Sequence, residues 1–401
     1  MKDAAKSSLD DLVENRTEEA VSVIESCKGR SGLYASSDLY RHEHWTRDIS
    51  YSLDGLLEAG YRKEVKNDLE SIWVRQKKNG KVSVLYVDKV LPWVLNSMKK
   101  GRLASLFRRA SGIKAVLNAV QHTADPTLHA IAATYEYAKN TGDVDMLSRF
   151  KSGIGKAIAY TEERLVDGFV VGCDWRDLMP ELKNDRLLSN QCLLYRVYEL
   201  SGEHEKAEKL KNRINEKFWN GEYYVSGLDS KDFDALGASL AVVWEIVPSD
   251  RYGQLAEMFR KTTTKYGIKN MLIMDEKTIG KKAGIPECDH YGKIWPFVSY
   301  TAVLALKKMG FEEFAHAEMD KLGKLEGFNE WYDPDSGKPR GSRDQLWSAA
   351  TYIDAVEKME TPTDDTIYLS KILKGSESFS KSMLDAIQGS SNSALDQRQQ
   401  D

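Results

Sequence analysis

Residues 44–76, HWTRDISYSLDGLLEAGYRKEVKNDLESIWVRQ, contain two helical segments of opposite character. The first segment, up to Gly60, carries few charges and many small and aromatic residues, so a helix there must be buried on most of its sides. The second segment, residues 61–76, is strongly charged and has apolar residues at helical spacing, which suits a helix with one face in water. Together they predict a helical hairpin with one inner and one outer helix.

The same alternation runs through most of the chain. Charged amphipathic segments recur at 142–165 and 202–219. Charge-poor segments begin about 45 to 80 residues apart, near His44, Asp125, Leu187, Asp232, His290 and Ser342. This pattern predicts an all-α fold, an (α/α)6 toroid or six-hairpin barrel in which each hairpin packs against its neighbours. Period-two alternation is confined to 81–87 and 168–172, and we interpret 81–90 as a hairpin in a small insertion between the first and second inner helices.

The overall composition excludes several classes of partner. The 401 residues are 41% hydrophobic and carry a formal net charge of −4, with basic residues spread along the chain. We interpret the basic stretch 99–114 as a solvated face of the insertion, and because no long basic track is present, nucleic acid is not an expected partner. The chain has no apolar run of about 18 residues and no apolar leader, which predicts a cytoplasmic protein without a membrane partner.

The cysteine and histidine patterns give no sign of a metal site. Cys27, Cys173, Cys192 and Cys288 are isolated and belong to no zinc-ligand spacing, so we interpret them as buried thiols in a reducing compartment. His42 and His44 form an HxH pair, but the adjoining WTRD segment accounts for this region without a metal. We therefore expect no metal and no cofactor.

Polar and aromatic residues gather where the inner helices begin. They lie in WTRD (45–48), ADPT (124–127), CDWRD (173–177), HYGKIWP (290–296) and NEWYDPDSGKPRGSRDQLW (329–347). In a toroid the inner helices run the same way, so their N-termini meet around one funnel. Many carboxylates and indoles in one funnel are typical of a sugar site, because flat rings take the apolar faces of pyranoses and acidic groups hold the hydroxyls.

These motifs resemble the glycoside hydrolases built on an (α/α)6 barrel, namely the amylo-α-1,6-glucosidase domain of glycogen debranching enzymes, glucoamylases, processing α-glucosidases and neutral trehalases. WTRD looks like the element whose aspartate grips the distal hydroxyls of the terminal glucose. Residues 124–143 are similar to a debranching-enzyme segment, and 328–350 match a glutamate before an aromatic, then P-x-G, then Q-x-W-S-x-A. The resemblance covers roughly residues 30–358 and keeps the family's order of elements.

Two carboxyl groups are candidates for the chemistry. Inversion at a glycosidic carbon needs one carboxylic acid to protonate the leaving oxygen and one carboxylate to activate water on the opposite face. The resemblance implies that Glu330 is the base. For the acid, WRD falls where debranching enzymes and trehalases place an aspartate beside a tryptophan, so Asp177 is the candidate and Asp174 the reserve. We expect Arg340 or Arg343 to keep Glu330 ionised.

Further residues of the same motifs are candidates for sugar binding. They are Trp45, Arg47, Asp48, Asp125, Trp175, Arg176, Gln191, Tyr291, Trp295, Trp331, Gln345 and Trp347. The chain departs from the debranching pattern at His129, where the family has tryptophan, and at Ser189, where it usually has glutamate.

These observations predict an inverting, exo-acting glycoside hydrolase that releases a monosaccharide, glucose on the resemblance, from the non-reducing end of an α-linked oligosaccharide or glucoside. The alternatives are a mannosylglycerate-type hydrolase, a sugar phosphorylase, an N-acylsugar epimerase on the same barrel, or a helical scaffold without catalysis. Residues 1–360 are expected to form a single catalytic domain. Residues 361–401 are expected to be a C-terminal extension, poor in large apolar residues and disordered over roughly its last 20 residues.

Overall fold

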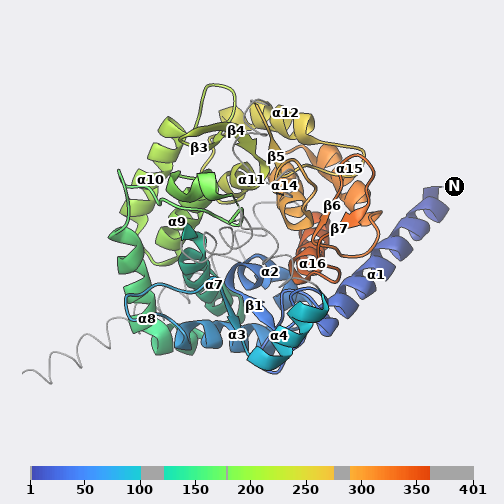
Figure 1. The fold of residues 1–401 in the computed structure, drawn as a ribbon. Coiled ribbons are helices and arrows are strands. Elements are labelled where there is room, and N and C mark those ends of the chain that lie inside the picture. The colour runs from blue at the N-terminus through green and yellow to red at the C-terminus, as the bar shows by residue number, and fades with distance from the viewer. Residues whose placement is uncertain (1, 101–121, 178, 275–289, 362–401) are drawn as a thin grey trace, which may run out of the picture.

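A computed structural model describes residues 2–100, 122–177, 179–274 and 290–361 (Figure 1). Helices dominate these residues, which confirms the prediction of a helical chain. The helices are α1 (Lys2–Ser26), α2 (Thr46–Glu58), α3 (Arg62–Val74), α4 (Val90–Lys99), α7 (Asp125–Thr141), α8 (Val144–Glu162), α9 (Leu188–Leu200), α10 (His204–Lys217), α11 (Ala235–Val243), α12 (Tyr252–Thr262), α14 (Pro296–Lys308), α15 (Glu312–Gly323) and α16 (Leu346–Glu360). Two short 3-10 helices, η1 (Pro180–Asn184) and η2 (Ser249–Arg251), lie in the connections.

Within the described residues, a closed ring of helices surrounds the axis of the molecule. In chain order the ring consists of α2, α7, α9, α11, α14 and α16, each packed on the next, and α16 returns to α2. An outer helix packs on each of them, α3 on α2, α8 on α7, α10 on α9, α12 on α11, α15 on α14, and α1 on α16 (Figure 1). The chain therefore has an α/α-barrel-like fold.

The inner helices begin close to the positions that the sequence predicts, at Thr46, Asp125, Leu188, Ala235, Pro296 and Leu346. Their charge-poor sequences are buried on several sides, as expected for helices enclosed by a second layer. One contact depends on a missing side chain. A Cβ at Gly55 of α2 would lie 1.9 Å from the carbonyl oxygen of Ala350 in α16, so only glycine allows these two helices to approach so closely.

Short strands lie in the connections before the inner helices. They are β1 (Glu43–Trp45), β2 (Leu85–Val87), β3 (Val225–Gly227), β4 (Ser230–Asp234), β5 (Met271–Leu272), β6 (Trp331–Tyr332) and β7 (Pro339–Arg340). They form the antiparallel sheets β1–β2, β3–β4–β5 and β6–β7. Since β1 runs into α2 and β4 into α11, these sheets flank the end of the ring where the inner helices begin.

The insertion between α3 and α7 differs from its prediction. The alternating segment 81–87 does contain a strand, but β2 pairs with β1, with Glu43 opposite Val87, and 81–90 is not a hairpin. Helix α4 follows β2 directly. The alternating segment 168–172 forms no strand, because Phe169 makes only an isolated bridge with Val166.

Several predictions fall outside the described residues. These are the part of the basic stretch beyond residue 100, Cys288, and the extension from residue 362. Among the helices that are described, none combines the length and the apolar character needed to cross a membrane.

Candidate active site

The loops that precede the inner helices are tied together by backbone bridges. Thr123 pairs with Cys173, which joins the loops before α7 and α9. Ser36 pairs with Gln345, and Ile294 pairs with Tyr332, which joins the segments before α2, α14 and α16. The motifs with polar and aromatic residues therefore meet at one end of the ring, as the sequence predicted.

Arg47 joins two of the predicted site carboxylates. Its side chain is buried, and its Nε and Nη2 donate to the two carboxylate oxygens of Asp125 at 3.0 and 3.2 Å. Its Nη1 donates to Asp177 Oδ2 at 2.6 Å. The first turns of α2 and α7 and the loop before α9 supply the three residues. The predicted acid Asp177 thus lies against a guanidinium in this structure.

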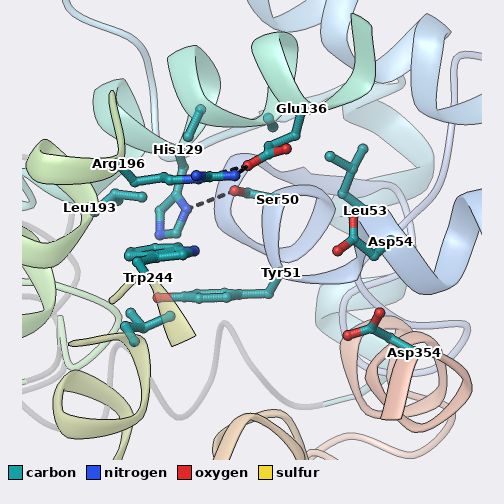
Figure 2. Close-up of a pocket in the computed structure, with 13 residues that line it drawn as sticks. Ser50, Tyr51, Leu53, Asp54, His129, Glu136, Leu193, Arg196, Trp244 and Asp354 are labelled. Atoms are coloured by element: carbon teal, nitrogen blue, oxygen red, sulfur yellow. Dashed lines mark hydrogen bonds and ion pairs between the residues drawn. The ribbon is translucent and has the colours of Figure 1, made fainter. Parts of the chain in front are cut away.

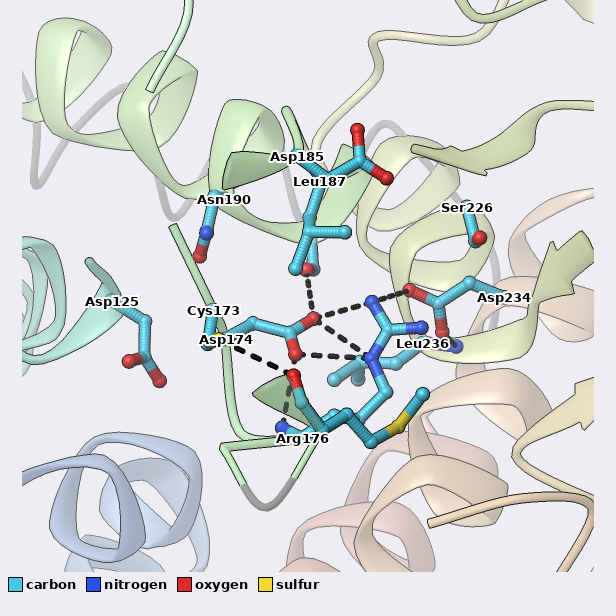
Figure 3. Close-up of polar contacts among 12 residues, drawn as sticks. Asp125, Cys173, Asp174, Arg176, Asp185, Leu187, Asn190, Ser226, Asp234 and Leu236 are labelled. Atoms are coloured by element: carbon cyan, nitrogen blue, oxygen red, sulfur yellow. Dashed lines mark hydrogen bonds and ion pairs between the residues drawn. The ribbon is translucent and has the colours of Figure 1, made fainter. Parts of the chain in front are cut away.

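Arg176 joins a second pair of carboxylates, as Figure 3 shows. Its Nη2 lies 2.6 Å from Asp174 Oδ2 and 3.2 Å from Asp234 Oδ2. Asp174 also accepts from the Ser189 hydroxyl at 2.5 Å, and Asp234 caps α11 by accepting from Leu236 N at 3.1 Å. Burial acts to raise the pKa of Asp174, but Arg176 and these hydrogen bonds hold it below its ordinary value.

This second cluster is closed by the protein itself. Arg176 and Asp234 have no exposed surface, and Asp174 is 2% exposed. Asp174 is therefore less accessible than Asp177, which is 5% exposed, although an arginine contacts each of the two carboxylates at 2.6 Å. Arg176, a predicted sugar ligand, donates to Asp174 from Nε and Nη2 and to the Met271 sulfur from Nη1.

Glu330 is held at the other side of the site. Tyr40 Oη donates to its Oε1 at 2.7 Å, and the backbone N–H of Ser342 donates to its Oε2 at 2.8 Å. A Cβ at Gly341, where φ is +68°, would lie 2.3 Å from Oε2, so this glycine makes room for the carboxylate. Of the arginines expected to keep Glu330 ionised, Arg340 is exposed, and Arg343, 73% exposed, lies 3.6 Å from Asp38.

Asp48 is linked both to Arg47 and to the surroundings of Glu330. It follows Arg47 in the chain, and the Gln345 side-chain amide donates to its Oδ1 at 3.3 Å. Burial raises the pKa of Asp48 well above its ordinary value; Arg47 opposes this rise, and the charges of Glu330 and Glu43 add to it. The mutual effect places Asp48 within electrostatic reach of Glu330.

Aromatic side chains fill the space between the two halves of the site. The Trp175 ring lies 5.0 Å from Trp295 and 5.3 Å from His290, and Trp347 stacks on Phe297 at 4.2 Å. The loop before α9 supplies Trp175, and the segments at the starts of α14 and α16 supply the other indoles. Three of the predicted sugar-binding tryptophans are therefore in one cluster.

Some buried polar atoms of this region have no hydrogen-bond partner among the described residues. They are Trp175 Nε1, Trp347 Nε1, Gln345 Oε1 and His129 Nε2. Buried polar groups in folded proteins are nearly always paired, so each such group calls for a ligand, a water molecule or a functional reason. Three of these four residues were predicted from the sequence as sugar ligands.

The remaining predicted ligands differ in their surroundings. Trp45 donates from Nε1 to Glu43 at 2.9 Å, Tyr291 packs on the small cluster around Cys173, and Trp331 lies under the ammonium of Lys293. Gln191 is buried and bonds the backbone of Val170 with both ends of its amide. Because those bonds occupy both its oxygen and its nitrogen, Gln191 holds the loop before α9 in place.

Sequence reasoning missed the residues that hold Glu330 and Trp45. Tyr40 and Ser342 contact Glu330, and Glu43 accepts from Trp45. Glu43 lies within RHEHWTRD (41–48), where its place between two histidines and next to WTRD was a signal. Tyr40 had no local signal, because it lies 290 residues from Glu330 in the sequence, and Ser342, 12 residues away, acts through its backbone N–H, which no residue type signals.

His129, a departure from the family pattern, stands behind the site. Its Nδ1 lies 2.9 Å from Ser50 Oγ and its Nε2 lies 3.7 Å from Asp125 Oδ2. Burial lowers the pKa of His129 to about 3, and Arg47 adds to this effect. The imidazole is therefore neutral at physiological pH.

Figure 2 shows a cavity of about 120 Å³ farther along the inner helices. Its lining consists of Ser50, Tyr51, Leu53, Asp54, His129, Ala132, Ala133, Glu136, Leu193, Arg196, Leu240, Trp244 and Asp354. His129 and Ser50 separate this cavity from Asp125 and the site. Glu136 and Arg196 form an ion pair across its wall.

Among the described residues, no group of three or more histidine, cysteine or acidic side chains is arranged to hold a metal ion. His42 and His44, the HxH pair, lie with Asp88 and Asp68. His44 Nδ1 is 2.8 Å from Asp68 Oδ1, and His42 Nδ1 is 3.8 Å from Asp88 Oδ1.

Comparison with protein families identifies the class of the chain. Residues 199–348 match the model of the mannosylglycerate hydrolase MGH1-like glycoside hydrolase domain. The matched stretch contains Glu330, Gln345 and Trp347, but not Asp177 or WTRD. A comparison with curated protein sequences gives no match.

Solved structures share the fold. A GH63 mannosylglycerate hydrolase from Thermus thermophilus, in complex with Tris and D-glycerate, superposes with a TM-score of 0.64 at 12% identity, over 84% of this chain and 99% of that chain. The same enzyme in complex with glucose gives a TM-score of 0.61 at 13% identity, over 84% and 98%. A glycosidase variant in complex with glucose gives 0.62 at 13% identity, over 87% and 97%.

The partial family match and the shared fold support a glycosidase with a fold of the α/α-barrel superfamily of glycoside hydrolases. Within that superfamily the match is to the mannosylglycerate-hydrolase-like domain. The resemblance to debranching enzymes, glucoamylases and processing α-glucosidases is thus supported at the level of the superfamily and not at the level of those families. A carbohydrate is the substrate.

Proposed function

We propose that this protein is an inverting, exo-acting glycosidase that releases one monosaccharide, glucose in the first instance, from the non-reducing end of an α-linked oligosaccharide or glucoside. One observation carries the proposal. Trp175, Trp347 and Gln345 have buried polar atoms without partners among the described residues, beside two separately held carboxylates. Sugar hydroxyls supply both donors and acceptors and would satisfy all three atoms.

In this proposal Glu330 activates the attacking water. Two neutral donors, Tyr40 Oη and the Ser342 N–H, orient its carboxylate and stabilise the charge that a base needs. Trp331 and Phe328 flank it in the sequence, and Phe328 is buried. We expect the carboxyl groups of Glu330 and Asp177 to lie about 6.5 to 9.5 Å apart in the substrate complex, which leaves room for water.

Asp177 is the proposed acid, and its contact with Arg47 sets a condition on its action. Proton donation requires that Asp177 exchange the 2.6 Å contact with Arg47 Nη1 for the glycosidic oxygen. Arg47 keeps its two bonds to Asp125 and stays in place. Entry of the leaving group between Arg47 and Asp177 would therefore couple substrate binding to activation of the acid.

Asp48 is proposed to bind the terminal sugar, and Arg47 would bind it through the Nη1 that Asp177 gives up. Both are buried at the start of α2, and charge-assisted hydrogen bonds from such groups to hydroxyls are strong and directional. The indoles of Trp175, Trp295 and Trp347 would cover the apolar faces of the ring. Tyr291, Trp331 and Trp45 remain further ligands in this proposal.

Fold, domain and compartment belong to the same proposal. We infer an (α/α)6 toroid with six hairpins, a catalytic domain over residues 1–360 and a separate extension over 361–401. The thiols of Cys27, Cys173 and Cys192 are buried and free, which supports a reducing, cytoplasmic location. The proposed reaction uses no metal or other cofactor.

A second candidate function is hydrolysis of a mannosylglycerate-type substrate. The observation that favours it is the match of residues 199–348 to the mannosylglycerate hydrolase MGH1-like domain. Glucose and mannose share the equatorial 4-hydroxyl that Asp48 would bind, so the proposed site serves either sugar.

The test is hydrolysis of maltose, isomaltose, kojibiose, nigerose, trehalose and mannosylglycerate, followed by early NMR. Release of β-glucose before its α-anomer from at least one glucoside supports the proposal. Mannose released only from mannosylglycerate supports the second candidate. First release of the α-anomer, cleavage of internal bonds, or a requirement for phosphate would overturn the inverting exo-hydrolase. Asp177→Asn and Glu330→Gln serve as controls for contaminating activity.

A further inference from the structure

Glu43 is a buried carboxylate that binds two indoles. It lies in β1 and is 2% exposed. Trp45 Nε1 donates to its Oε2 at 2.9 Å, and Trp93 Nε1 donates to its Oε1 at 2.8 Å. Trp45 precedes α2, whereas Trp93 belongs to α4 in the insertion. One carboxylate therefore joins the barrel to the insertion.

This arrangement requires a carboxylate. Each oxygen accepts one indole N–H, which donates and cannot accept. A glutamine of the same length would offer one acceptor, and its NH2 group would face the second N–H donor. Burying a charge costs free energy, so retaining it here implies a role that a neutral residue cannot fill.

The two indoles keep part of their surface accessible. Trp45 and Trp93 are both half-buried, although their N–H groups are engaged with a buried residue. The bond to Glu43 anchors each indole at its N–H edge. Flat aromatic faces held in this way take the apolar sides of sugar rings.

Contacts of Trp45 place this pair at the wall of the proposed site. The Tyr40 ring meets Trp45 edge-on at 6.0 Å and 72°, and Tyr40 holds Glu330. The Arg47 guanidinium lies 5.7 Å from the centre of the Trp45 ring. The charge of Glu43 is also felt at Asp48, where it adds to the effect of burial.

Helix α4 lies along the segment that carries these residues. Asn96 Nδ2 donates to Asp38 O at 3.3 Å, and Lys100 forms an ion pair with Asp38. Asp38 also faces Arg343, next to the Ser342 that holds Glu330. Helix α4 is thus joined through Asp38 to the segment that leads into β1.

We propose that Glu43 is a positioning residue that sets two adjoining sugar platforms, Trp45 for the sugar that is released and Trp93 for the sugar residue it leaves behind. The inference rests on the proposed glycosidase function and adds a source of specificity to it. Substrates whose leaving group is a sugar would use both platforms. Aryl glycosides, whose leaving group is a small phenol, would use Trp45 alone.

Kinetics of the full chain test this with four variants. Glu43→Gln should lower kcat/KM about tenfold on the best disaccharide, mainly through KM, because a charge-assisted hydrogen bond to each indole is weakened. Trp93→Ala should lower kcat/KM on the disaccharide and leave the matching p-nitrophenyl glycoside within about twofold. Glu43→Gln and Trp93→Phe should be non-additive when combined, since both act on one bond.

Two matched controls come from elsewhere in the chain. Glu318→Gln alters another buried carboxylate, on α15, and Trp73→Phe removes another buried indole bond, to Thr134 on α7. Both should leave KM unchanged. The inference is overturned if Glu43→Gln behaves like Glu318→Gln, if Trp93→Ala affects both substrates equally, or if the Glu43 and Trp93 effects simply add.

A measurement without turnover separates this inference from the proposed function. In protein labelled with 5-fluorotryptophan, Glu43→Gln should shift the ¹⁹F resonances of Trp45 and Trp93 and leave that of Trp73 in place. Adding D-glucose should shift the Trp45 resonance of the wild type. If the wild type hydrolyses no glycoside, the proposed function fails whatever these spectra show; unmoved Trp45 and Trp93 resonances in Glu43→Gln overturn the positioning role even in an active enzyme.

Discussion

Two arginines at the same end of the ring each lie between two aspartates, yet their surroundings differ. Arg176 joins Asp174 to Asp234, and Ser189 and the N-terminus of α11 complete the cluster. Arg47 joins Asp125 to Asp177, and the nearby His129 Nε2, 3.7 Å from Asp125 Oδ2, has no hydrogen-bond partner among the described residues. The first cluster is enclosed by the protein, although Asp234 Oδ2 has no hydrogen-bond partner among the described residues, whereas the second is proposed to be completed by a substrate.

The comparison shows how one kind of ion pair serves two purposes. An arginine between two buried carboxylates balances their charge in both places. What distinguishes them is accessibility, because the Asp177 side chain is 8% exposed whereas Arg176 and Asp234 have no exposed surface. A closed cluster stabilises the fold, and an open one leaves hydrogen-bonding capacity for a ligand.

The largest expected effect is on the closed cluster. Arg176→Met should lower the free energy of unfolding by about 3–5 kcal/mol, because it leaves Asp174 and Asp234 buried without their cation. Arg47→Met should cost less stability, since Asp177, at 8% side-chain exposure, lies nearer to water. Urea unfolding of both variants measures this. Equal losses would mean that the two clusters are alike in stability and that the comparison is wrong.

The aspartates give the second largest effect. Asp177→Asn and Glu330→Gln should each lower kcat about 100-fold or more while the variants stay folded, since general acid–base catalysis contributes on that order. Asp174→Asn should do the reverse. It should clearly lower the stability of the fold, while the activity per folded molecule stays within about tenfold of that of the wild type. Circular dichroism and kcat, measured on the same preparations, check both. An inactive but stable Asp174→Asn would make Asp174 the acid.

Local sequence could not separate these two aspartates. CDWRD (173–177) places Asp174 and Asp177 three residues apart, each next to an arginine or a tryptophan. Their difference comes from Asp234 and Arg47, which lie far away in the sequence and reach the cluster only through the closure of the ring. Choosing between them from the sequence therefore rested on family resemblance.

The ring itself was easier to predict. Helices enclosed by a second layer must lack charge on several faces. Stretches of consecutive residues such as 44–60 and 125–141 show this lack of charge directly. Details that depend on contacts between distant segments were not accessible, as with β2, which pairs with β1 and not with its sequence neighbour. Tyr40, which donates to Glu330 from 290 residues away, was missed for the same reason.

A smaller effect concerns the orientation of Glu330. Tyr40→Phe removes the hydroxyl that donates to Oε1 at 2.7 Å, and a bond to a charged group is worth about 1.5–3 kcal/mol, so kcat/KM should fall at least tenfold. Tyr223→Phe, which removes a bond to Lys231 O on the outer part of the ring, is the matched control. Full activity in Tyr40→Phe would show that the Ser342 N–H alone orients the base.

At the far end of the ring a third cation lies between two aspartates, and the effect expected there is the smallest. Lys358 Nζ lies 2.7 Å from Asp54 Oδ2 and from Asp354 Oδ1, beside the cavity of Figure 2. Burial raises the pKa of Asp354 from 3.8 to about 6, against the opposing charge of Lys358. Unlike the two arginines, Lys358 is 39% exposed.

The direction in which Asp354 makes stability depend on pH follows from how many protons the folded and unfolded states bind. Between about pH 4 and 6 the folded state keeps the Asp354 proton that the unfolded chain has lost. The stabilising contribution of Asp354 is therefore complete below its pKa in the unfolded chain and disappears as pH rises through about 6. The free energy of unfolding of the wild type should therefore decline relative to that of Asp354→Asn over this window. Urea unfolding at half-unit intervals from pH 4 to 7 measures the difference, with the exposed Asp250→Asn expected to run parallel to the wild type. A constant difference between the wild type and Asp354→Asn would mean that Lys358 balances both aspartates, as Arg176 does in the closed cluster.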